Sequence, residues 1–187
     1  FVKSLSLLVK NDYFPSFAII MENKDGIMEP GQQIVNFDNS KLRGENKPNT
    51  AYHDKYFDYD EPLTTTFKNA KIPFETCDNT DINSGEVINL LKSREESYFI
   101  YSGIGGVILG DEVLSIGKKY LHMHSGRAPQ YRGSTTIYYS ILNENQCSVS
   151  AFFLDKSIDT GPLLKIKELK FTKLKRGQVL VKVFYLL

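Results

Sequence analysis

Short apolar runs alternate along this chain with segments whose apolar residues recur at helical spacing, and this alternation restricts the fold. The run from Tyr98 to Tyr101 has the length of a strand, whereas Val87, Ile88 and Leu91 fall on one face of a helix. The predicted strands cover residues 16–21, 72–76, 98–101, 119–124 and 149–154, and the predicted helices cover residues 61–69, 81–92, 111–116 and 134–143. Alternating strands and helices indicate an α/β domain with a mainly parallel central sheet flanked by helices, in which ligands bind beyond the carboxyl ends of the strands.

The two ends of the chain depart from this pattern. Residues 2–10 have helical spacing, so the chain opens on a helix where a domain of this type normally opens on a strand, and we expect the first strand to be missing. Residues 22–60 are polar and rich in Asn, Asp, Gly and Pro, which predicts an irregular segment with a short helix. We therefore expect one domain over residues 1–164 and a C-terminal β extension over residues 165–187, where lysines alternate with apolar residues.

Composition and charge argue against several classes of function. Lys+Arg 23 against Asp+Glu 22 gives a net charge of +1, without the basic face of a nucleic-acid binder. There is no stretch of about 18 uninterrupted apolar residues, so we expect no membrane span. Cys77 and Cys147 belong to no Cys/His cluster, which disfavours a zinc site and a disulfide framework and makes a reducing cytoplasm the default location.

The residues most suited to chemistry are a pair of histidines and a later aspartate. His122 and His124 lie two residues apart on a predicted strand and should therefore point to one side of the sheet, close to a turn that contains Pro129 and Gly133. Asp159 follows in the sequence Ile-Asp-Thr-Gly, and His with Asp is a common combination for moving a proton near neutral pH.

Each of these residues also has a structural alternative. Either histidine could be a hydrogen-bonded core residue, and Asp159 could be a turn or capping residue. A metal site built on the histidine pair would need a third ligand, which Asp159 or Asp155 could supply, but we predict no metal.

A glycine cluster follows the strand at residues 98–101. Gly103, Gly105 and Gly106 lack the spacing of a dinucleotide-binding fingerprint. The cluster either makes a tight turn without a ligand, or it lets backbone N–H and C=O groups approach a flat heterocycle, which glycine permits most easily.

The stretch from Tyr98 to Leu164 resembles the folate-dependent formyltransferases, the family of glycinamide ribonucleotide, methionyl-tRNA and amino-sugar N-formyltransferases. The family segment Asn-x-His-x-Ser/Gly-x-x-Pro-x-Tyr-Arg-Gly corresponds here to residues 122–133, and the family's Ile-Asp-Thr-Gly corresponds to residues 158–161. The two motifs at this spacing are more specific than either alone. The resemblance implies a Rossmann-like formyltransferase fold, with 10-formyltetrahydrofolate as the formyl donor.

The resemblance also implies roles for the matching residues. His124 and Asp159 match the family's catalytic His and Asp, and His122 stands where the family has an Asn that helps to bind the formyl oxygen. The residues implied to hold the pterin ring of the donor are Ile104, Gly105, Gly106, Val107, Ile108, Leu109, Leu154, Asp155, Lys156 and Ser157. The residues implied to bind the substrate are Pro129, Tyr131, Arg132 and Gly133.

The chemistry of formyl transfer suits these side chains. An amine attacks the formyl carbonyl, His124 and His122 donate hydrogen bonds to the developing oxyanion, and Asp159 orients His124 and helps to relay the proton that leaves the amine. We expect the acceptor to be a small amine, most simply an amino sugar used in surface-polysaccharide synthesis. A methionyl-tRNA enzyme would carry a further C-terminal domain and a positive surface, and the glycinamide ribonucleotide enzyme would carry an early glycine-rich phosphate loop, which this chain lacks.

Several alternatives remain open at this point. The histidine pair could belong to a metal-dependent hydrolase, a class that lacks a clear third ligand here. The chain could be a non-catalytic member of the fold that binds folate or a nucleotide sugar, a reading that the replacement of Asn by His122 favours. The segment from Gly177 to Tyr185 also resembles the opening strands of medium-chain alcohol dehydrogenases, so the β extension could begin a fused second domain, or it could be a terminal hairpin. The sequence leaves a homodimer open.

Overall fold

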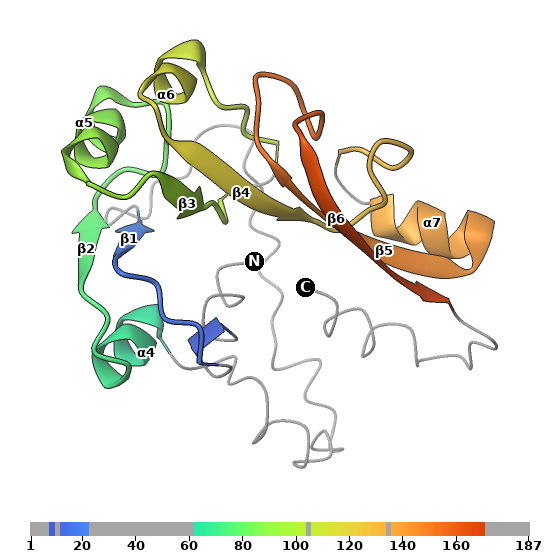
Figure 1. Ribbon diagram of the computed structural model, residues 1–187, viewed down its shortest axis with the longest axis horizontal. Helices are drawn as coiled ribbons and strands as arrows, with labels where there is room; N and C mark the ends of the chain where they lie inside the picture. Colours follow the sequence, from blue (N-terminus) through green and yellow to red (C-terminus); the bar gives the residue numbers. More distant parts are fainter. Residues whose placement is uncertain (1–7, 10–11, 23–61, 104–105, 134–135, 171–187) are drawn as a thin grey trace, which may run out of the picture. The chain divides into compact units, whose positions relative to one another are not determined.

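The computed structural model describes residues 8–9, 12–22, 62–103, 106–133 and 136–170 (Figure 1). The chain forms two compact units, Phe1–Thr80 and Asp81–Leu187. Two predictions lie largely outside the described residues. Of the helix predicted at residues 2–10, only residues 8–9 are described, and of the irregular segment predicted at residues 22–60, only residue 22 is described.

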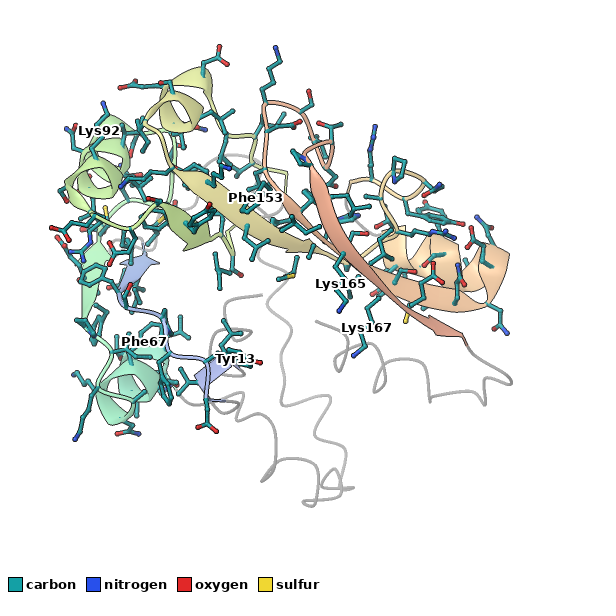
Figure 2. All side chains as sticks on the ribbon, in the orientation of Figure 1. Tyr13, Phe67, Lys92, Phe153, Lys165 and Lys167 are labelled. Atoms are coloured by element: carbon teal, nitrogen blue, oxygen red, sulfur yellow. The ribbon has the colours of Figure 1, made fainter. Side chains whose placement is uncertain are left out.

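In the first unit, two parallel strands share a small core with one helix. Strand β1 (Ala18–Met21) pairs in parallel with β2 (Phe74–Cys77), and helix α4 spans Leu63–Asn69. Phe67, labelled in Figure 2, is 1% exposed, and its ring centroid lies 5.9 Å from that of Phe74. The two strands and the helix predicted for this unit are therefore confirmed.

Helix α4 begins two residues later than the sequence indicated. Pro62 occupies the N-cap position with an extended backbone, and the N–H groups of Thr65 and Thr66 donate to its carbonyl oxygen. Proline has a fixed φ and no N–H group, so it suits a position at the start of a helix.

The second unit alternates helices and strands, as predicted, except that its last two elements are both strands. Its elements are α5 (Gly85–Ser93), β3 (Tyr98–Ile100), α6 (Asp111–Ser115), β4 (Lys119–His124), α7 (Thr136–Glu144), β5 (Gln146–Phe153) and β6 (Leu163–Lys170). Ser84 is the N-cap residue of helix α5, and its side chain accepts a hydrogen bond from the Val87 N–H group. This N–H group lies in the first turn, where no carbonyl of the helix can accept from it. Val87, Ile88 and Leu91 are buried, which confirms the predicted apolar face.

The four strands of the second unit form one sheet of mixed direction. Their order is β3-β4-β5-β6, and Figure 1 shows them side by side, with α7 next to β5. The pair β3–β4 is parallel, whereas β4–β5 and β5–β6 are antiparallel. The α/β class is confirmed. The prediction of a mainly parallel sheet holds for β1–β2 and β3–β4 but not for the two later strands.

Strand β6 crosses the boundary that the sequence suggested after residue 164. Its residues Leu163–Lys170 pair with β5 over most of the length of that strand, and Figure 2 shows Lys165 and Lys167 leaving the same side of β6. Residues 171–187 lie outside the described part of the chain, so the dehydrogenase-like extension stays a prediction. No helix among the described residues is both long and apolar enough to cross a lipid bilayer.

Candidate functional site

The two histidines of β4 lie on one face of the sheet. His122 is opposite Phe152 on β5, and His124 is opposite Ser150, so the alternation of side chains places both imidazoles with these two residues. The ring of Phe152 lies 5.9 Å from the His122 ring and 6.2 Å from the His124 ring. The shared face predicted from the i, i+2 spacing is confirmed.

His124 is buried, and a protein oxygen atom lies near each of its ring nitrogens. The residue is 5% exposed. Its Nε2 lies 2.7 Å from the Tyr131 carbonyl oxygen, and because a carbonyl only accepts, Nε2 must carry the proton. Its Nδ1 lies 3.4 Å from Oδ2 of Asp159. The convergence of His124 and Asp159, across 35 positions of sequence, is the geometry that the two motifs predicted.

Asp159 is held by its own loop and by the turn that follows the histidines. The Gly133 N–H group donates to Asp159 Oδ2 over 2.7 Å. Asp159 has φ +52°, a left-handed conformation that Asp tolerates better than most residues. Within the same loop, Asp155 Oδ1 accepts from the Ser157 N–H group at 3.0 Å and from the Thr160 hydroxyl at 2.6 Å, an arrangement that orders the turn before Asp159.

Close backbone packing explains two glycines of the motifs. A Cβ atom added at Gly161 would lie 1.7 Å from the Phe153 carbonyl oxygen. A Cβ atom added at Gly126 would lie 2.6 Å from His124 Nε2 and 2.6 Å from the Tyr131 carbonyl oxygen. Both positions exclude a side chain, and Gly126 does so at the catalytic candidate itself.

The buried Ser150 fastens the turn that carries the acceptor for His124. Its hydroxyl donates to the Gly126 carbonyl oxygen at 2.7 Å and accepts from the Ala128 N–H group at 2.9 Å. Thr136, at the start of α7, donates to the Ser125 carbonyl oxygen at 3.0 Å, and its hydroxyl also lies 3.4 Å from His124 Nε2. The turn is therefore anchored from β5 and from α7.

His122 reaches toward the end of β3. Its Nδ1 lies 3.1 Å from the Tyr101 carbonyl oxygen, to which it donates in the tautomer that carries the Nδ1 proton. Burial, with a smaller contribution from the negative charge of Asp81, raises the pKa of the Tyr101 hydroxyl above its ordinary value. Tyr101 is therefore neutral at physiological pH.

The loop after β3, which was predicted to hold the formyl donor, is held by Asn83, a residue just before the N-terminus of α5. The Asn83 side chain donates to the Ile108 carbonyl oxygen at 2.9 Å and accepts from the Gly110 N–H group at 2.7 Å. Gly106 has φ +86°, a conformation that glycine adopts without strain, whereas Ile104 and Gly105 lie outside the described residues. In the second predicted segment, the Leu154 N–H group donates to the Tyr120 carbonyl oxygen at 2.8 Å, which ties that segment to β4. Binding of a pterin by these segments stays a prediction.

A pocket of about 210 Å³ lies beside Asp159. Its lining residues are Ala128, Pro129, Arg132, Asp159, Thr160, Gly161 and Leu163. Of the residues predicted to bind substrate, Pro129 and Arg132 line this pocket. Tyr131 instead donates its hydroxyl to Glu144, and Gly133 contacts Asp159.

Sequence reasoning did not identify Asn83, Thr136 or Ser150 as supports of the site. Each of them makes a hydrogen bond to a backbone group distant in sequence, and no local sequence pattern predicts such a bond. Ser150 carried one usable signal, because it is a small polar residue in an otherwise apolar stretch that was predicted to be a strand.

Comparisons with known proteins point to one family. The methionyl-tRNA formyltransferase of Finegoldia magna is 30% identical over 91 residues, which cover 48% of this chain and 29% of that protein. The methionyl-tRNA formyltransferase of Thermodesulfovibrio yellowstonii is 32% identical over 95 residues, which cover 50% of this chain and 30% of that protein. The chain thus spans less than a third of the length of these relatives. No protein-family model matches it.

Solved structures agree with the sequence comparison at the level of the fold. Phosphoribosylglycinamide formyltransferase from Bacillus halodurans superposes with a TM-score of 0.54 at 17% identity, covering 90% of this chain and 86% of that one. The enzyme of the same name from Anaplasma phagocytophilum gives a TM-score of 0.56 at 9% identity, covering 91% and 77%. Sequence similarity over about half of the chain and a shared Rossmann-like fold together relate this chain to the folate-dependent formyltransferases.

Proposed function

We propose that this chain is an N-formyltransferase that moves a formyl group from 10-formyltetrahydrofolate to the amine of a small acceptor. The observation that carries the proposal is the meeting of His124 and Asp159 at the end of β4, with 3.4 Å between Nδ1 and Oδ2, beside a pocket. The relatives are named for formyl transfer, and both motifs that the family uses coincide with the residues that meet.

In the proposed reaction, the acceptor nitrogen bonds to the formyl carbon and the bond from that carbon to N10 of the donor breaks. One proton passes from the amine to N10, so the reaction is balanced without an oxidant or a metal. His124 is placed to donate to the oxyanion that develops on the formyl oxygen once its ring turns from the Tyr131 carbonyl. His122 lies on the same face and is the second donor in the tautomer that carries the proton on Nε2, which gives up the hydrogen bond to the Tyr101 carbonyl. Asp159 holds the His124 ring and supplies the carboxylate through which the proton passes.

The described residues fit a flat donor ring in one respect. In the loop after β3, Gly106 has no side chain to keep a flat ring away from the backbone. The Asn83 side chain holds the backbone of this loop by hydrogen bonds to Ile108 and Gly110. Ile108 itself is 45% exposed, which leaves an apolar side chain at a braced backbone edge. When bound there, the donor supplies the activated formyl group.

We propose an amino sugar as the acceptor, as in surface-polysaccharide synthesis in the cytoplasm. Pro129 and Arg132 line the pocket beside Asp159, and the Arg132 guanidinium offers fixed donors to the oxygens of a sugar or its phosphate. The net charge of +1 gives the chain no general attraction for a polyanion such as tRNA.

Calorimetry with a folate analogue, followed by a formyl-transfer assay over a panel of amino sugars, tests this function. Folate binding together with formylation of at least one amino sugar supports the proposal. Formylation of methionyl-tRNA alone would overturn the acceptor but keep the reaction class. The absence of folate binding would overturn both.

A second function, folate or nucleotide-sugar binding without catalysis, is favoured by two observations. Both ring nitrogens of His124 already face protein acceptors, and His122 stands in place of the family's Asn. Folate binding without turnover on any amine of the panel would select this function.

A further inference from the structure

We propose that His122, His124 and Asp159 form a binding site for a single divalent transition-metal ion such as Zn²⁺. One ligand atom from each of these three residues lies within 4.8 Å of the other two. From the sequence alone we expected no metal, because the position of a third ligand was unknown. The fold supplies that ligand by bringing the loop after β5 against the histidine face of β4.

The spacing between His124 Nδ1 and Asp159 Oδ2 suits two ligands of a tetrahedral ion. Zn²⁺ is bound by histidine nitrogen and carboxylate oxygen at about 2.0–2.2 Å, so two ligands of a tetrahedral site lie about 3.3 Å apart. His124 Nδ1 and Asp159 Oδ2 are 3.4 Å apart. That distance is long for a charge-assisted hydrogen bond, which is typically about 2.7–2.9 Å, but it matches two ligands on either side of a metal.

The hydrogen bonds of the two imidazoles leave one nitrogen of each ring for a metal. His122 donates Nδ1–H to the Tyr101 carbonyl oxygen at 3.1 Å, and His124 donates Nε2–H to the Tyr131 carbonyl oxygen at 2.7 Å. Histidines that bind a metal usually donate their other ring N–H to a backbone carbonyl or carboxylate, which fixes the tautomer and the ring orientation. In these tautomers His122 Nε2 and His124 Nδ1 each carry a lone pair, and an ion between His124 Nδ1 and Asp159 Oδ2 would replace the direct contact of these two atoms.

The surroundings also fit a transition metal. The Gly133 N–H group donates to Asp159 Oδ2 at 2.7 Å and orients the carboxylate, and Phe152 packs its ring against both imidazoles. Two imidazoles and one carboxylate disfavour Ca²⁺ and Mg²⁺, which prefer oxygen ligands. Three protein ligands leave a fourth position open, and Asp159 lines the pocket through which an ion can enter.

Bound metal would change the proposed reaction at the same site. The ion would occupy the Nδ1 lone pair of His124 and the carboxylate of Asp159, so formyl transfer and Zn²⁺ binding should exclude one another. This consequence rests on the proposed formyltransferase function, whereas metal binding itself does not.

Titration of the metal-free chain with Zn²⁺ by calorimetry, and with Co²⁺ by absorption, tests the site without any folate or amine. We expect one ion per chain and a Co²⁺ spectrum of the intense, four-coordinate kind. His122→Asn and Asp159→Asn should each weaken binding by at least about 100-fold, more than the loss of an outer hydrogen bond. Asp155→Asn is the matched control, because an Asn side-chain oxygen can still accept from Ser157 and Thr160, and binding should remain within about 3-fold of the wild type.

Four results would overturn the proposal. These are failure to bind Zn²⁺ or Co²⁺, unchanged affinity in His122→Asn or Asp159→Asn, an equal loss in Asp155→Asn, and a thiolate charge-transfer band that places the ion on a cysteine. Circular dichroism of each variant separates a lost ligand from a lost fold. If the ion binds as expected and no amine is formylated in metal-free buffer, the proposed function fails while the metal site stands.

Discussion

Ser148 and Ser150 are two buried serines on the same face of β5, and the same substitution should affect them in opposite ways. Both are 0% exposed. The Ser150 hydroxyl bonds to the Gly126 carbonyl and to the Ala128 N–H group, whereas the Ser148 hydroxyl has no hydrogen-bond partner among the described residues. Ser150→Ala therefore leaves two backbone groups without a partner, and Ser148→Ala removes a buried polar group that had none.

The magnitudes follow from the number of groups affected. A buried donor or acceptor left without a partner costs about 1–3 kcal/mol, so Ser150→Ala should lower the free energy of unfolding by about 2–4 kcal/mol after some relaxation of the turn. Ser148→Ala should leave it unchanged or raise it by up to about 1 kcal/mol, because the desolvated hydroxyl is removed.

Urea denaturation followed by far-UV circular dichroism measures both values, since the chain contains no tryptophan for fluorescence. The expected result is a gap of at least about 2 kcal/mol between the two variants, with similar dependence on urea. Equal losses of stability in both variants would refute the reasoning, because they would show that the two bonds of Ser150 contribute nothing beyond packing.

Two further predictions concern a glycine and a tyrosine. Gly126→Ala places a Cβ atom 2.6 Å from His124 Nε2, so it should lower the free energy of unfolding by about 1–3 kcal/mol and abolish formyl transfer. Gly85→Ala is the control, because a Cβ atom there meets no atom within 4 Å, and it should have neither effect. Retained transfer in Gly126→Ala would contradict the close packing. Burial raises the pKa of Tyr120 to about 12, above its ordinary value of 10.0. Burial of the neutral Tyr120 hydroxyl therefore favours the folded state fully below pH 10, and this contribution to stability is lost as pH rises toward 12. Tyrosinate absorbance should show an ionisation near pH 12 that Tyr120→Phe removes, and its persistence in that variant would assign it to another tyrosine.

Most elements of the second unit could be predicted from the sequence because each has a local signature. Strand β4 was expected at residues 119–124 and is found at Lys119–His124, and helix α6 ends one residue earlier than expected. The direction of β5 could not be predicted in this way. A strand, a helix and a strand in succession favour a parallel crossover, but β5 pairs antiparallel with β4, and periodicity carries no information on direction.

Some features of the candidate site could likewise be predicted from the sequence, and others could not. The i, i+2 spacing was enough to place His122 and His124 on one face, and the two motifs together indicated that Asp159 belongs with them. The backbone carbonyls of Tyr101 and Tyr131 fix the two rings, yet any residue carries a carbonyl, so sequence gives no sign of them. The choice between Asp159 and Asp155 as a third metal ligand likewise came only from the fold.

Transfer of an isotopically labelled formyl group from 10-formyltetrahydrofolate to an amino sugar, in metal-free buffer, tests the central claim most directly. Wild type, His124→Ala and Asp159→Asn are compared after each is shown to fold and to bind a folate analogue. The account predicts labelled product with the wild type and a fall of at least about 100-fold in both variants, the size expected when a donor to a developing oxyanion is lost or misplaced. Undiminished transfer in either variant would contradict it.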